Sequence, residues 1–393
     1  MTIDIAEVRR DTPATAKIVH FNNAGAALPP QPVVAAQIAH IQREAEIGGY
    51  EAATEAQARV ANIYASIARL IGANADEIAL VENATVGWDM AFYAVPLQEG
   101  DRILTAQAEY SSNYIAFLQR QRQIGFSIEV IPNTPTGEID VDALARMIDG
   151  RVKLIAITHV PTNGGLVNPA AEIGKIARQH GILYLLDACQ SVGQMPVDVN
   201  EMGCDLLSAT GRKYLRGPRG SGFLYVRRAV LDRLEPPFLD NHAADWTAPG
   251  KYELRPDARR FENWENNYAA QLGLGAAVDY TLDLGLENIA ARVDSLAALL
   301  RQRLSAIPGL TVADIGRRKC GIVSMHLSGK DSSALRTTLR QRGFNCSVST
   351  PASTLLDATA RRLPDVLRAS VHYYNTEEEV ERFTSELAGL ARS

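Results

Sequence analysis

A lysine and an acid stand in this chain where an aldehyde cofactor could use both. The apolar run 182–186 ends at Asp187, Gln190 follows three residues later, and Lys213 lies further on in a turn of glycines and small residues. A lysine amine forms a Schiff base with an aldehyde. An acid keeps the nitrogen of a pyridine ring protonated, so that the ring accepts electrons from a carbanion. These residues predict an enzyme that uses pyridoxal phosphate (PLP).

Each of these residues could also have an ordinary structural role. Asp187 could cap a helix that follows it, and Lys213 could be a solvated lysine in a turn. Yet Lys213 stands between Arg212 and Tyr214, in a glycine-rich turn between two probable strands, which is an unusual setting for a solvated lysine. The acid and the lysine together favour the cofactor. Burial near a cation would lower the pKa of Lys213, as a base requires.

A phosphate group would need donors, and two segments could provide them. The segment 82–87 leaves a predicted strand and opens a predicted helix, with Ala84 and Thr85 at the helix N-terminus. Free N–H groups and the helix dipole favour an anion there, although an ordinary helix cap would have the same sequence. Thr210 could add a hydroxyl, and Arg212 a charge-assisted hydrogen bond.

Two further side chains could contact the cofactor ring and the substrate. Tyr110 follows a predicted strand end and could stack on the ring, or it could be a half-buried core tyrosine. Arg368 begins an apolar run near the C-terminus. A guanidinium is the usual partner of a substrate carboxylate. The alternative is a surface ion pair between Arg368 and Asp365 or Glu377.

Composition limits the class of protein. The formal net charge is −5 and charged residues are not clustered, which argues against nucleic acid or an anionic membrane as the main partner. No apolar stretch is long enough to cross a membrane. The four cysteines are scattered, without a C-x-x-C pair, so we expect no metal site or disulfide framework and a reducing, cytoplasmic location.

Short apolar runs alternate with helical patterns through the middle of the chain. This predicts an α/β fold with a mostly parallel, seven-stranded sheet covered by helices on both faces. Ligands bind beyond the carboxyl ends of such strands, where the candidate residues lie. We expect a large domain over 21–284, a small α+β domain over 1–20 and 285–393, and an irregular segment over 234–260. The predicted strands are 78–81, 102–105, 127–131, 153–158, 182–186, 205–208, 222–226 and, in the small domain, 369–373.

Taken together, these motifs resemble the class V aminotransferase family of fold-type I PLP enzymes, which includes cysteine desulfurases, selenocysteine lyases and isopenicillin N epimerase-like proteins. The resemblance extends from 19–25 to 374–379, and the segment 187–198 with the Lys213 turn is its most specific part. It implies a homodimer, in which the segment 260–267 can reach the site of the neighbouring subunit.

The resemblance also implies roles for individual residues. Lys213 would bind the aldehyde, Asp187 the ring nitrogen and Gln190 the phenolate oxygen. Tyr110 would stack on the ring, and Asn23 and Arg368 would bind the substrate. The remaining cofactor contacts would come from Ala84, Thr85, Thr162, Asn163, Thr210 and Arg212.

Three departures from the desulfurase pattern bear on the reaction. Desulfurases carry a catalytic cysteine on a loop before the carboxylate-binding arginine, but here that loop has serine or threonine, and Cys346 comes too early. A hydroxyl cannot accept sulfur as a persulfide, because that step needs a thiolate. Thr162 stands where an asparagine is usual, with Asn163 beside it. Tyr50 replaces a substrate-side histidine and could act as an acid or base.

These departures favour a PLP lyase that eliminates a sulfur-linked β-substituent without a persulfide cysteine. An epimerase or aminotransferase of the same family is the alternative, and a cysteine desulfurase is the third choice. Racemisation needs a second acid or base, for which Tyr50 and Tyr110 are the candidates. A catalytically silent binding subunit is disfavoured, since Lys213, Asp187 and Gln190 are all present.

Overall fold

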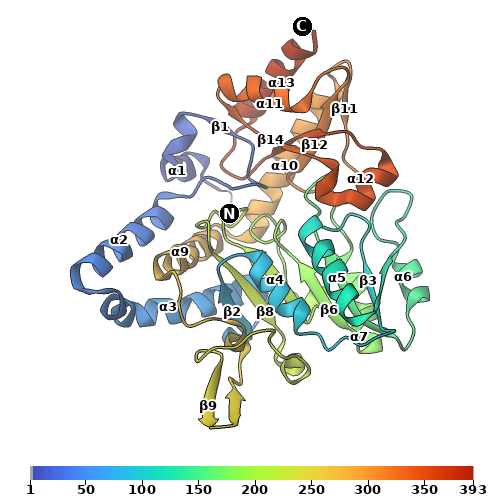
Figure 1. The fold of residues 1–393 in the computed structure, drawn as a ribbon. Helices are drawn as coiled ribbons and strands as arrows, with labels where there is room; N and C mark the ends of the chain where they lie inside the picture. The colour runs from blue at the N-terminus through green and yellow to red at the C-terminus, as the bar shows by residue number, and fades with distance from the viewer. Residues whose placement is uncertain (1–2, 393) are drawn as a thin grey trace.

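The computed structural model describes residues 3–392, and its central element is a seven-stranded sheet (Figure 1). The strand order is β2-β8-β7-β6-β5-β3-β4. Strand β8 runs antiparallel to both neighbours, while the other pairs are parallel. The predicted α/β fold with a mostly parallel sheet is therefore confirmed. The strands are β2 (Ile78–Val81), β3 (Arg102–Thr105), β4 (Ser127–Val130), β5 (Val152–Thr158), β6 (Leu183–Asp187), β7 (Leu206–Thr210) and β8 (Gly222–Val226).

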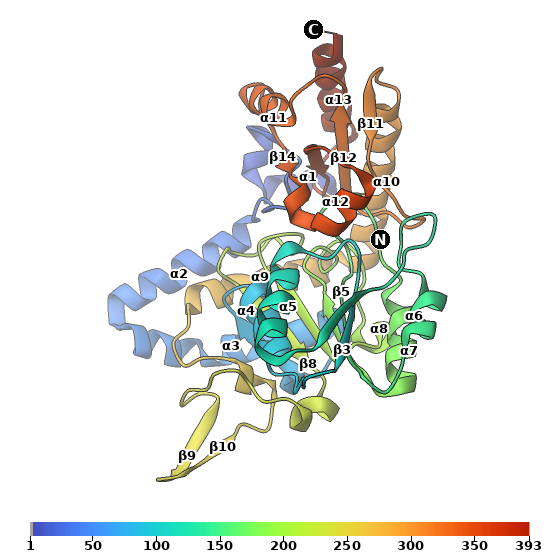
Figure 2. The same cartoon turned by 45° about the vertical axis from the view of Figure 1, so that its right-hand side comes forward.

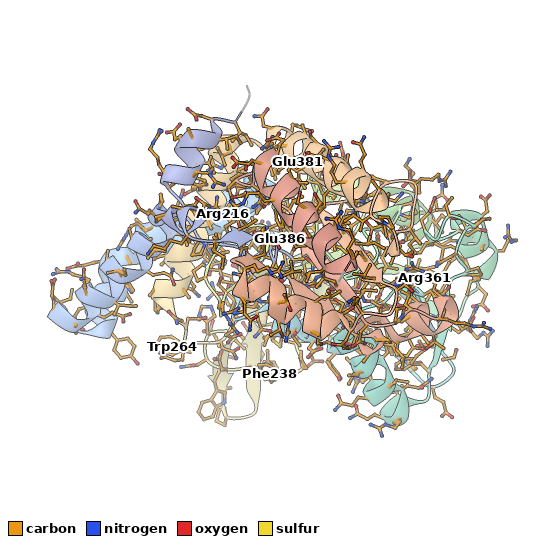
Figure 3. All side chains as sticks on the ribbon, turned by 90° about the horizontal axis from the view of Figure 1, so that it is seen from above. Arg216, Phe238, Trp264, Arg361, Glu381 and Glu386 are labelled. Carbon is orange, nitrogen blue, oxygen red and sulfur yellow. The ribbon has the colours of Figure 1, made fainter. Side chains whose placement is uncertain are left out.

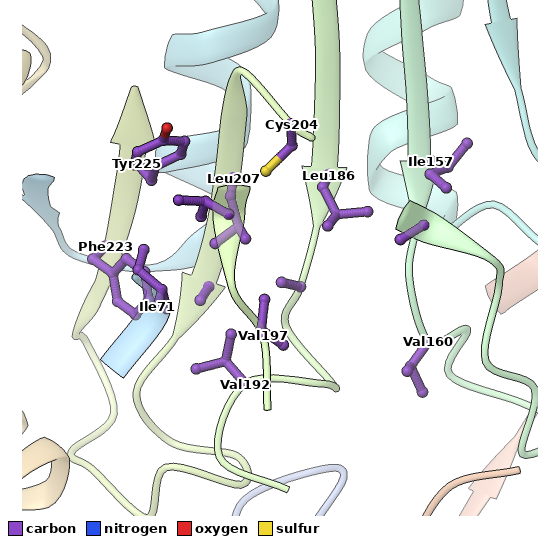
Figure 4. Packing of buried hydrophobic residues seen from close by; sticks show 14 of the residues in the cluster. Ile71, Ile157, Val160, Leu186, Val192, Val197, Cys204, Leu207, Phe223 and Tyr225 are labelled. Carbon is purple, nitrogen blue, oxygen red and sulfur yellow. The ribbon is translucent and has the colours of Figure 1, made fainter. Parts of the chain in front are cut away.

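Both faces of this sheet are buried, which explains the continuous apolar runs in the sequence. Successive residues of a strand point to opposite faces. Leu154 and Ala156 accordingly pack with α4 (Ala84–Tyr93) and α5 (Ser111–Ile124). Ile155 and Ile157 pack on the other face with α3 (Gly49–Ile71) and α7 (Ala170–His180). Figure 4 shows part of this second cluster around Leu186, Leu207 and Phe223. Buried helices on both sides leave only the strand ends for polar chemistry.

A smaller antiparallel sheet lies beyond the upper end of the large one in Figure 2. Its order is β11-β12-β15-β14. A third apolar cluster joins Val8, Val19 and Phe21 of the N-terminal segment with residues from 289 to 387. This packing supports the predicted two-domain division, which stays a prediction and whose residues 1, 2 and 393 lie outside the described chain. The elements are α1 (Ile5–Arg10), β1 (Val19–His20), α10 (Leu286–Ser305), β11 (Leu310–Val312), β12 (Ile322–Leu327), α11 (Ser332–Gln341), β13 (Phe344–Asn345), β14 (Ser347–Ser349), α12 (Leu355–Arg361), β15 (Val366–Ser370) and α13 (Glu377–Arg392).

Two elements differ from the sequence prediction. The strand expected over 369–373 is β15, which ends at Ser370, and His372 to Tyr374 turn into the protein interior. The segment 234–260, predicted as irregular, contains the hairpin of β9 (Ala244–Ala248) and β10 (Lys251–Leu254). The hairpin residues are mostly exposed. The two strands do alternate apolar and polar residues, as Trp246 and Tyr252 with their neighbours show, but the prolines and other turn formers around them favoured an irregular segment.

Arg216 connects the two ends of the chain to the turn that follows Lys213. Its side chain is 1% exposed. It donates hydrogen bonds to the Leu28 carbonyl (2.8 Å), the Tyr373 hydroxyl (2.7 Å) and the Thr12 hydroxyl. No carboxylate pairs with it within residues 3–392. Instead, the guanidinium carbon lies 4.6 Å from the centre of the Tyr374 ring, a cation–π contact. Figure 3 labels Arg216 between the N-terminal and C-terminal elements.

The backbone of Arg216 is strained. Its φ of +61° lies in the left-handed region, which side chains other than glycine rarely adopt. Such a conformation persists only where the surrounding contacts hold it. The hydrogen bonds and the aromatic rings around the guanidinium provide those contacts, so the side chain fixes the conformation of the turn.

We predict that Arg216→Gln lowers the free energy of unfolding by roughly 3 kcal/mol, because buried acceptors lose a charged donor. Denaturant unfolding of the two proteins measures the difference. Arg219→Gln is the matched control, since Arg219 is exposed in the same turn. Equal losses in the two variants would contradict the role of the buried guanidinium.

Candidate functional site

The Lys213 turn is held from within by close backbone contacts. It leaves β7 and returns to β8, and the Gly211 N–H donates to the Ser221 carbonyl (2.9 Å). The Gly217 N–H donates to the Gly211 carbonyl (2.7 Å), and the Arg216 N–H donates to the Lys213 carbonyl (2.9 Å). A Cβ atom at Gly211 would lie 2.4 Å from the Ser221 hydroxyl oxygen. The glycine-rich sequence is therefore needed for the turn to close.

The same turn is held from outside by both ends of the chain. The Ala27 N–H donates to the Arg212 carbonyl (2.9 Å), and His372 Nε2 donates to the Tyr214 carbonyl (2.8 Å). Burial lowers the pKa of His372 well below its ordinary value, so the ring donates as a neutral tautomer. Lys213 Nζ has no hydrogen-bond partner among the described residues. Burial lowers the Lys213 pKa, which favours the neutral amine that attacks an aldehyde.

Asp187 lies at the end of β6 and is oriented by two hydrogen bonds. Its Oδ1 accepts from the Cys189 N–H (3.0 Å), and its Oδ2 accepts from the Asn113 amide (3.1 Å). No helix begins after Asp187, because the next one, α8 (Val199–Met202), starts further along. The helix-cap alternative is therefore wrong.

Glu109 and Asn113 are site residues that the sequence reasoning did not assign. Asn113 also donates to Glu109 Oε1 (2.8 Å), so its amide links the two carboxylates. Glu109 accepts further hydrogen bonds from the backbone of Tyr110 and Thr158 (both 3.0 Å) and from the hydroxyls of Thr105 and Thr158. Burial raises the pKa of Glu109 to about 7, despite these donors. The signal in the sequence was an acid just after a strand, followed four residues later by asparagine.

The predicted phosphate donors lie together around Gly222. This glycine pairs with Thr210 on β7, and a Cβ on it would lie 3.4 Å from the Ala84 backbone nitrogen. The Asn83 side chain accepts from the Val86 N–H, while the N–H groups of Ala84 and Thr85 at the start of α4 have no partner among the described atoms. Arg212 donates to the Thr210 hydroxyl (3.0 Å). The arrangement leaves donors at one helix N-terminus for an anion.

Gln190 offers an acceptor that the protein itself does not use. Its amide nitrogen donates to the Ala24 carbonyl (3.1 Å), while its buried Oε1 has no hydrogen-bond partner within residues 3–392. Buried polar atoms are nearly always paired. The orphaned oxygen, the free amine of Lys213 and the unpaired N–H groups of α4 together fit a cofactor with an aldehyde, a ring hydroxyl and a phosphate.

Arg368 is buried near Lys213 rather than paired at the surface. It donates to the Thr162 carbonyl (3.2 Å) and hydroxyl and to the Ser347 hydroxyl (3.1 Å). It pairs with no carboxylate in the described part of the chain, and Glu377 pairs with Arg292 instead. The surface ion-pair alternative is therefore wrong, and the guanidinium is free to bind an anionic substrate group.

Two other predicted residues lie beside Arg368. Tyr110 sits at the N-terminus of α5 and is close enough to affect the pKa of Arg368 electrostatically. The Asn163 amide donates to the Thr354 hydroxyl (3.2 Å), while its buried Oδ1 has no partner among the described residues. Since Thr162 is hydrogen-bonded to Arg368, the predicted residues Tyr110, Thr162 and Asn163 lie on the same side of the site as this arginine.

The side chains of two predicted site residues are not available to a group at Lys213 within one chain. Tyr50 begins α3, is 72% exposed, and lines a separate cavity with Trp264 and Tyr268. Within one chain it cannot act on a group at Lys213. Asn23 is fully buried, and its amide donates to the Ser370 carbonyl (2.7 Å) while accepting from the Tyr374 hydroxyl. Because both ends of that amide are used within the protein, its predicted role in substrate binding is corrected to a structural one.

The four cysteines differ in their access to the site. Cys189 is partly exposed and adjoins Asp187, whereas Cys204, Cys320 and Cys346 are buried. Cys346 packs in the apolar cluster of the small sheet, and burial raises its pKa to about 12. Burial also raises the pKa of Cys189 well above the ordinary value.

Comparison with known proteins identifies the family. Residues 18–383 match the family model described as aminotransferase class-V. A probable cysteine desulfurase of Xylella fastidiosa is 33% identical, over 98% of this chain and 95% of its own. A probable cysteine desulfurase of Methanothermobacter thermautotrophicus is 29% identical over 98% of both chains. The apo structure of the cysteine desulfurase from Thermococcus onnurineus NA1 superposes with a TM-score of 0.92 at 26% identity, over 100% of this chain and 99% of that chain.

These relatives correct the reaction expected from the sequence. That expectation was a β-eliminating lyase without a persulfide cysteine, with an epimerase or aminotransferase as the alternative. The similar proteins are instead named cysteine desulfurases. The lack of a cysteine in the loop before Arg368 is therefore not enough to indicate a different reaction. The matched length and the geometry around Lys213 show that the chain belongs to the class V aminotransferase family, whose cofactor is pyridoxal phosphate.

Proposed function

We propose that this protein is a cysteine desulfurase, which transfers the sulfur of L-cysteine to a thiol and leaves L-alanine. The carbon–sulfur bond of the substrate breaks, a sulfur–sulfur bond forms on the acceptor thiol, and the β-carbon gains a proton. The names of the relatives support this substrate. The observation that carries the proposal is the free amine of Lys213 between Asp187 and the unpaired, buried Arg368.

Each side chain of the site then has a role that its contacts support. PLP, when bound, withdraws electrons from the bond to the substrate α-carbon. Lys213 would bind the aldehyde of the cofactor and would move the substrate α-proton at Nζ, which its lowered pKa favours. Asp187 would keep the ring nitrogen protonated, Gln190 Oε1 would accept a hydrogen bond from the ring hydroxyl, and Arg368 would bind the substrate carboxylate.

The proposed reaction requires a thiol that accepts the sulfur. Cys189 is the cysteine that lies among the site residues. A thiol attacks as the thiolate, and burial raises the pKa of Cys189 well above its ordinary value, so the attack must be coupled to loss of the thiol proton. The other acceptor is an added thiol or a partner protein. All four cysteines are free, and this supports the cytoplasmic location, which stays a prediction.

We predict that the purified holoenzyme converts L-cysteine to L-alanine, and that Lys213→Ala abolishes both turnover and the visible absorbance of the bound cofactor. The assay measures the amounts of alanine, pyruvate and sulfide that form from L-cysteine, with and without an added thiol. Asp187→Ala should lower the rate by orders of magnitude while the protein stays folded. Pyruvate and sulfide without alanine would contradict desulfuration.

Variants of two cysteines identify the acceptor in the same assay. If Cys189 accepts the sulfur, Cys189→Ser should lose alanine formation and Cys346→Ser should keep it. If both variants stay active only with an added thiol, the acceptor is external. Loss of alanine formation in Cys346→Ser alone would mean that Cys346 accepts the sulfur, which requires the buried segment around it to open.

The chain of side chains behind Asp187 supports a positioning role for Glu109. Its carboxylate fixes Asn113, and Asn113 fixes the oxygen of Asp187 that is not bound to the Cys189 N–H. Glu109 is also a buried acid whose pKa is about 7 when folded and ordinarily 4.5. A raised acid pKa means that the folded state binds the proton more tightly. Protonated Glu109 therefore stabilises the folded protein fully below pH 4.5, and this stabilisation is lost as the pH rises to 7.

We predict that the free energy of unfolding falls by roughly 3 kcal/mol between pH 4.5 and 7 because of Glu109, and that Glu109→Gln removes this slope. Denaturant unfolding at several pH values measures it. Glu82→Gln is the control, because Glu82 is exposed at the same end of the sheet. If the free energy of unfolding of Glu109→Gln depended on pH as in the parent protein, the slope would not come from Glu109.

We also propose a homodimer, supported by the apolar surface of α2 (Gln31–Ile47). Val34, Ile38 and Ile41 lie on one stripe of this helix and are 38%, 49% and 56% exposed. Tyr50 and Trp264 are exposed nearby around a shared cavity of about 430 Å³. Figure 3 labels Trp264 on the side of the molecule from which the long helices project. A contiguous apolar surface of this kind is typical of a protein interface.

We predict that the Ile38→Glu, Ile41→Glu double variant is a monomer of 42.7 kDa, while the parent protein has twice that mass in sedimentation analysis. Charged side chains in an apolar interface lose their solvation, which opposes association. Ile115→Glu is the control, because Ile115 is 65% exposed on α5. A monomeric parent protein would rule out the dimer.

A further inference from the structure

A groove of about 1050 Å³ lies at the end of the large sheet opposite Lys213. It is continuous with a second cavity of about 490 Å³, because both are lined by Val95, Pro96 and Arg233. The second cavity contacts Lys153 and Leu183, near the first residues of β5 and β6, whereas Asp187 ends β6. The groove is therefore separate from the site described above. Figure 1 shows the β9–β10 hairpin, whose Leu254 lines the groove, at this end of the molecule.

Arg260 is a buried cation in the wall of this groove. It is 6% exposed, and its hydrogen bonds go to the carbonyls of Arg255 (2.7 Å) and Leu231 (3.3 Å). No carboxylate lies within ion-pair distance of it in the described part of the chain. Burial lowers its pKa. A guanidinium removed from water without a counterion is unfavourable, so an anion in the groove would be strongly attracted.

Two more arginines face the same groove without an ion-pair partner among residues 3–392. The Nε of Arg120 is buried and has no acceptor there, and its guanidinium carbon lies 5.8 Å from the centre of the Tyr93 ring. Arg233 is exposed and makes one long hydrogen bond to the Gly181 carbonyl (3.4 Å). Three guanidinium groups around one groove can together bind the oxygens of a phosphate or carboxylate.

Two acids, Asp232 and Glu235, also line the groove, but neither lies within ion-pair distance of these arginines. Glu235 accepts from the Tyr252 hydroxyl (3.1 Å), and Asp232 affects the pKa of Arg260 only from beyond ion-pair distance. Asp149, in the adjoining cavity, pairs with Arg102 (2.9 Å) and Arg151 (3.0 Å). Lys153 adds a further positive charge there. The local charge balance therefore favours an anion.

We propose that this groove binds a small molecule that carries an oxyanion, with the anion on Arg260, Arg120 and Arg233. Tyr93 and the apolar residues Pro96, Leu234, Pro236, Pro237 and Leu254 form the rest of the lining and would contact the less polar part of the ligand. A phosphate and a polycarboxylate would use the same guanidinium contacts. This site does not depend on the reaction at Lys213.

The test uses holoenzyme, in which the bound cofactor already fills the phosphate donors at α4. Inorganic pyrophosphate and citrate are titrated separately by calorimetry. We expect saturable binding of at least one of them, weakened about 10-fold or more in the Arg120→Gln, Arg233→Gln double variant. Arg228→Gln is the matched control, because Arg228 lies in the same short helix as Arg233 but does not line the groove and already pairs with Asp76.

The results distinguish a phosphate ligand from a polycarboxylate ligand, and both from the absence of an anion site. Tighter binding of pyrophosphate assigns a phosphate-bearing ligand, and tighter binding of citrate assigns a polycarboxylate. Arg260→Gln should abolish binding if circular dichroism shows the variant to be folded, while the visible absorbance of the cofactor stays unchanged. Absence of saturable binding of both anions, or equal affinity in the Arg120, Arg233 double variant, would overturn the proposal.

Discussion

The buried guanidinium of Arg216 is the contact on which the rest of the structure depends. It binds the N-terminal segment at Leu28 and the C-terminal segment at Tyr373, and its own backbone is part of the turn that carries Lys213. A cation without a carboxylate is tolerated there because carbonyl and hydroxyl oxygens and aromatic rings surround it. Together with the hydrogen bonds of Ala27 and His372 to the same turn, this residue links the packing of both chain ends to the position of Lys213.

The site itself combines rigid donors with a few unpaired groups. Glu109 and Asn113 are engaged with protein partners, and the hydrogen bonds from Asn113 and the Cys189 N–H fix the oxygens of Asp187. The orphaned oxygen of Gln190 and the free amine of Lys213, in contrast, have no partner in the described chain. This division is what a preorganised cofactor site requires: the supporting groups are satisfied by the protein, and the contacting groups are left for the ligand.

Family membership and reaction chemistry rest on different observations. The class V match covers residues 18–383, and the relatives are named cysteine desulfurases. Cys346 is nevertheless buried in an apolar cluster, and the thiol nearest the site is Cys189. The positions of the cysteines therefore distinguish this chain from the desulfurase pattern, while the cofactor and the fold do not.

The sequence alone determined the seven strands, the helices between them and the PLP assignment, because short, continuous apolar runs between helical segments are typical of strands buried on both faces. It also predicted Asp187, Gln190 and Lys213, whose types and spacing are set by local chemistry. Tertiary structure alone decided the contacts between distant segments: the link from Glu109 through Asn113 to Asp187, the internal hydrogen bonds of Asn23, and the remote place of Tyr50. The physical reason is that a side chain's partners depend on how the chain folds back on itself. Residue type shows only which hydrogen bonds a side chain can make, not which it makes.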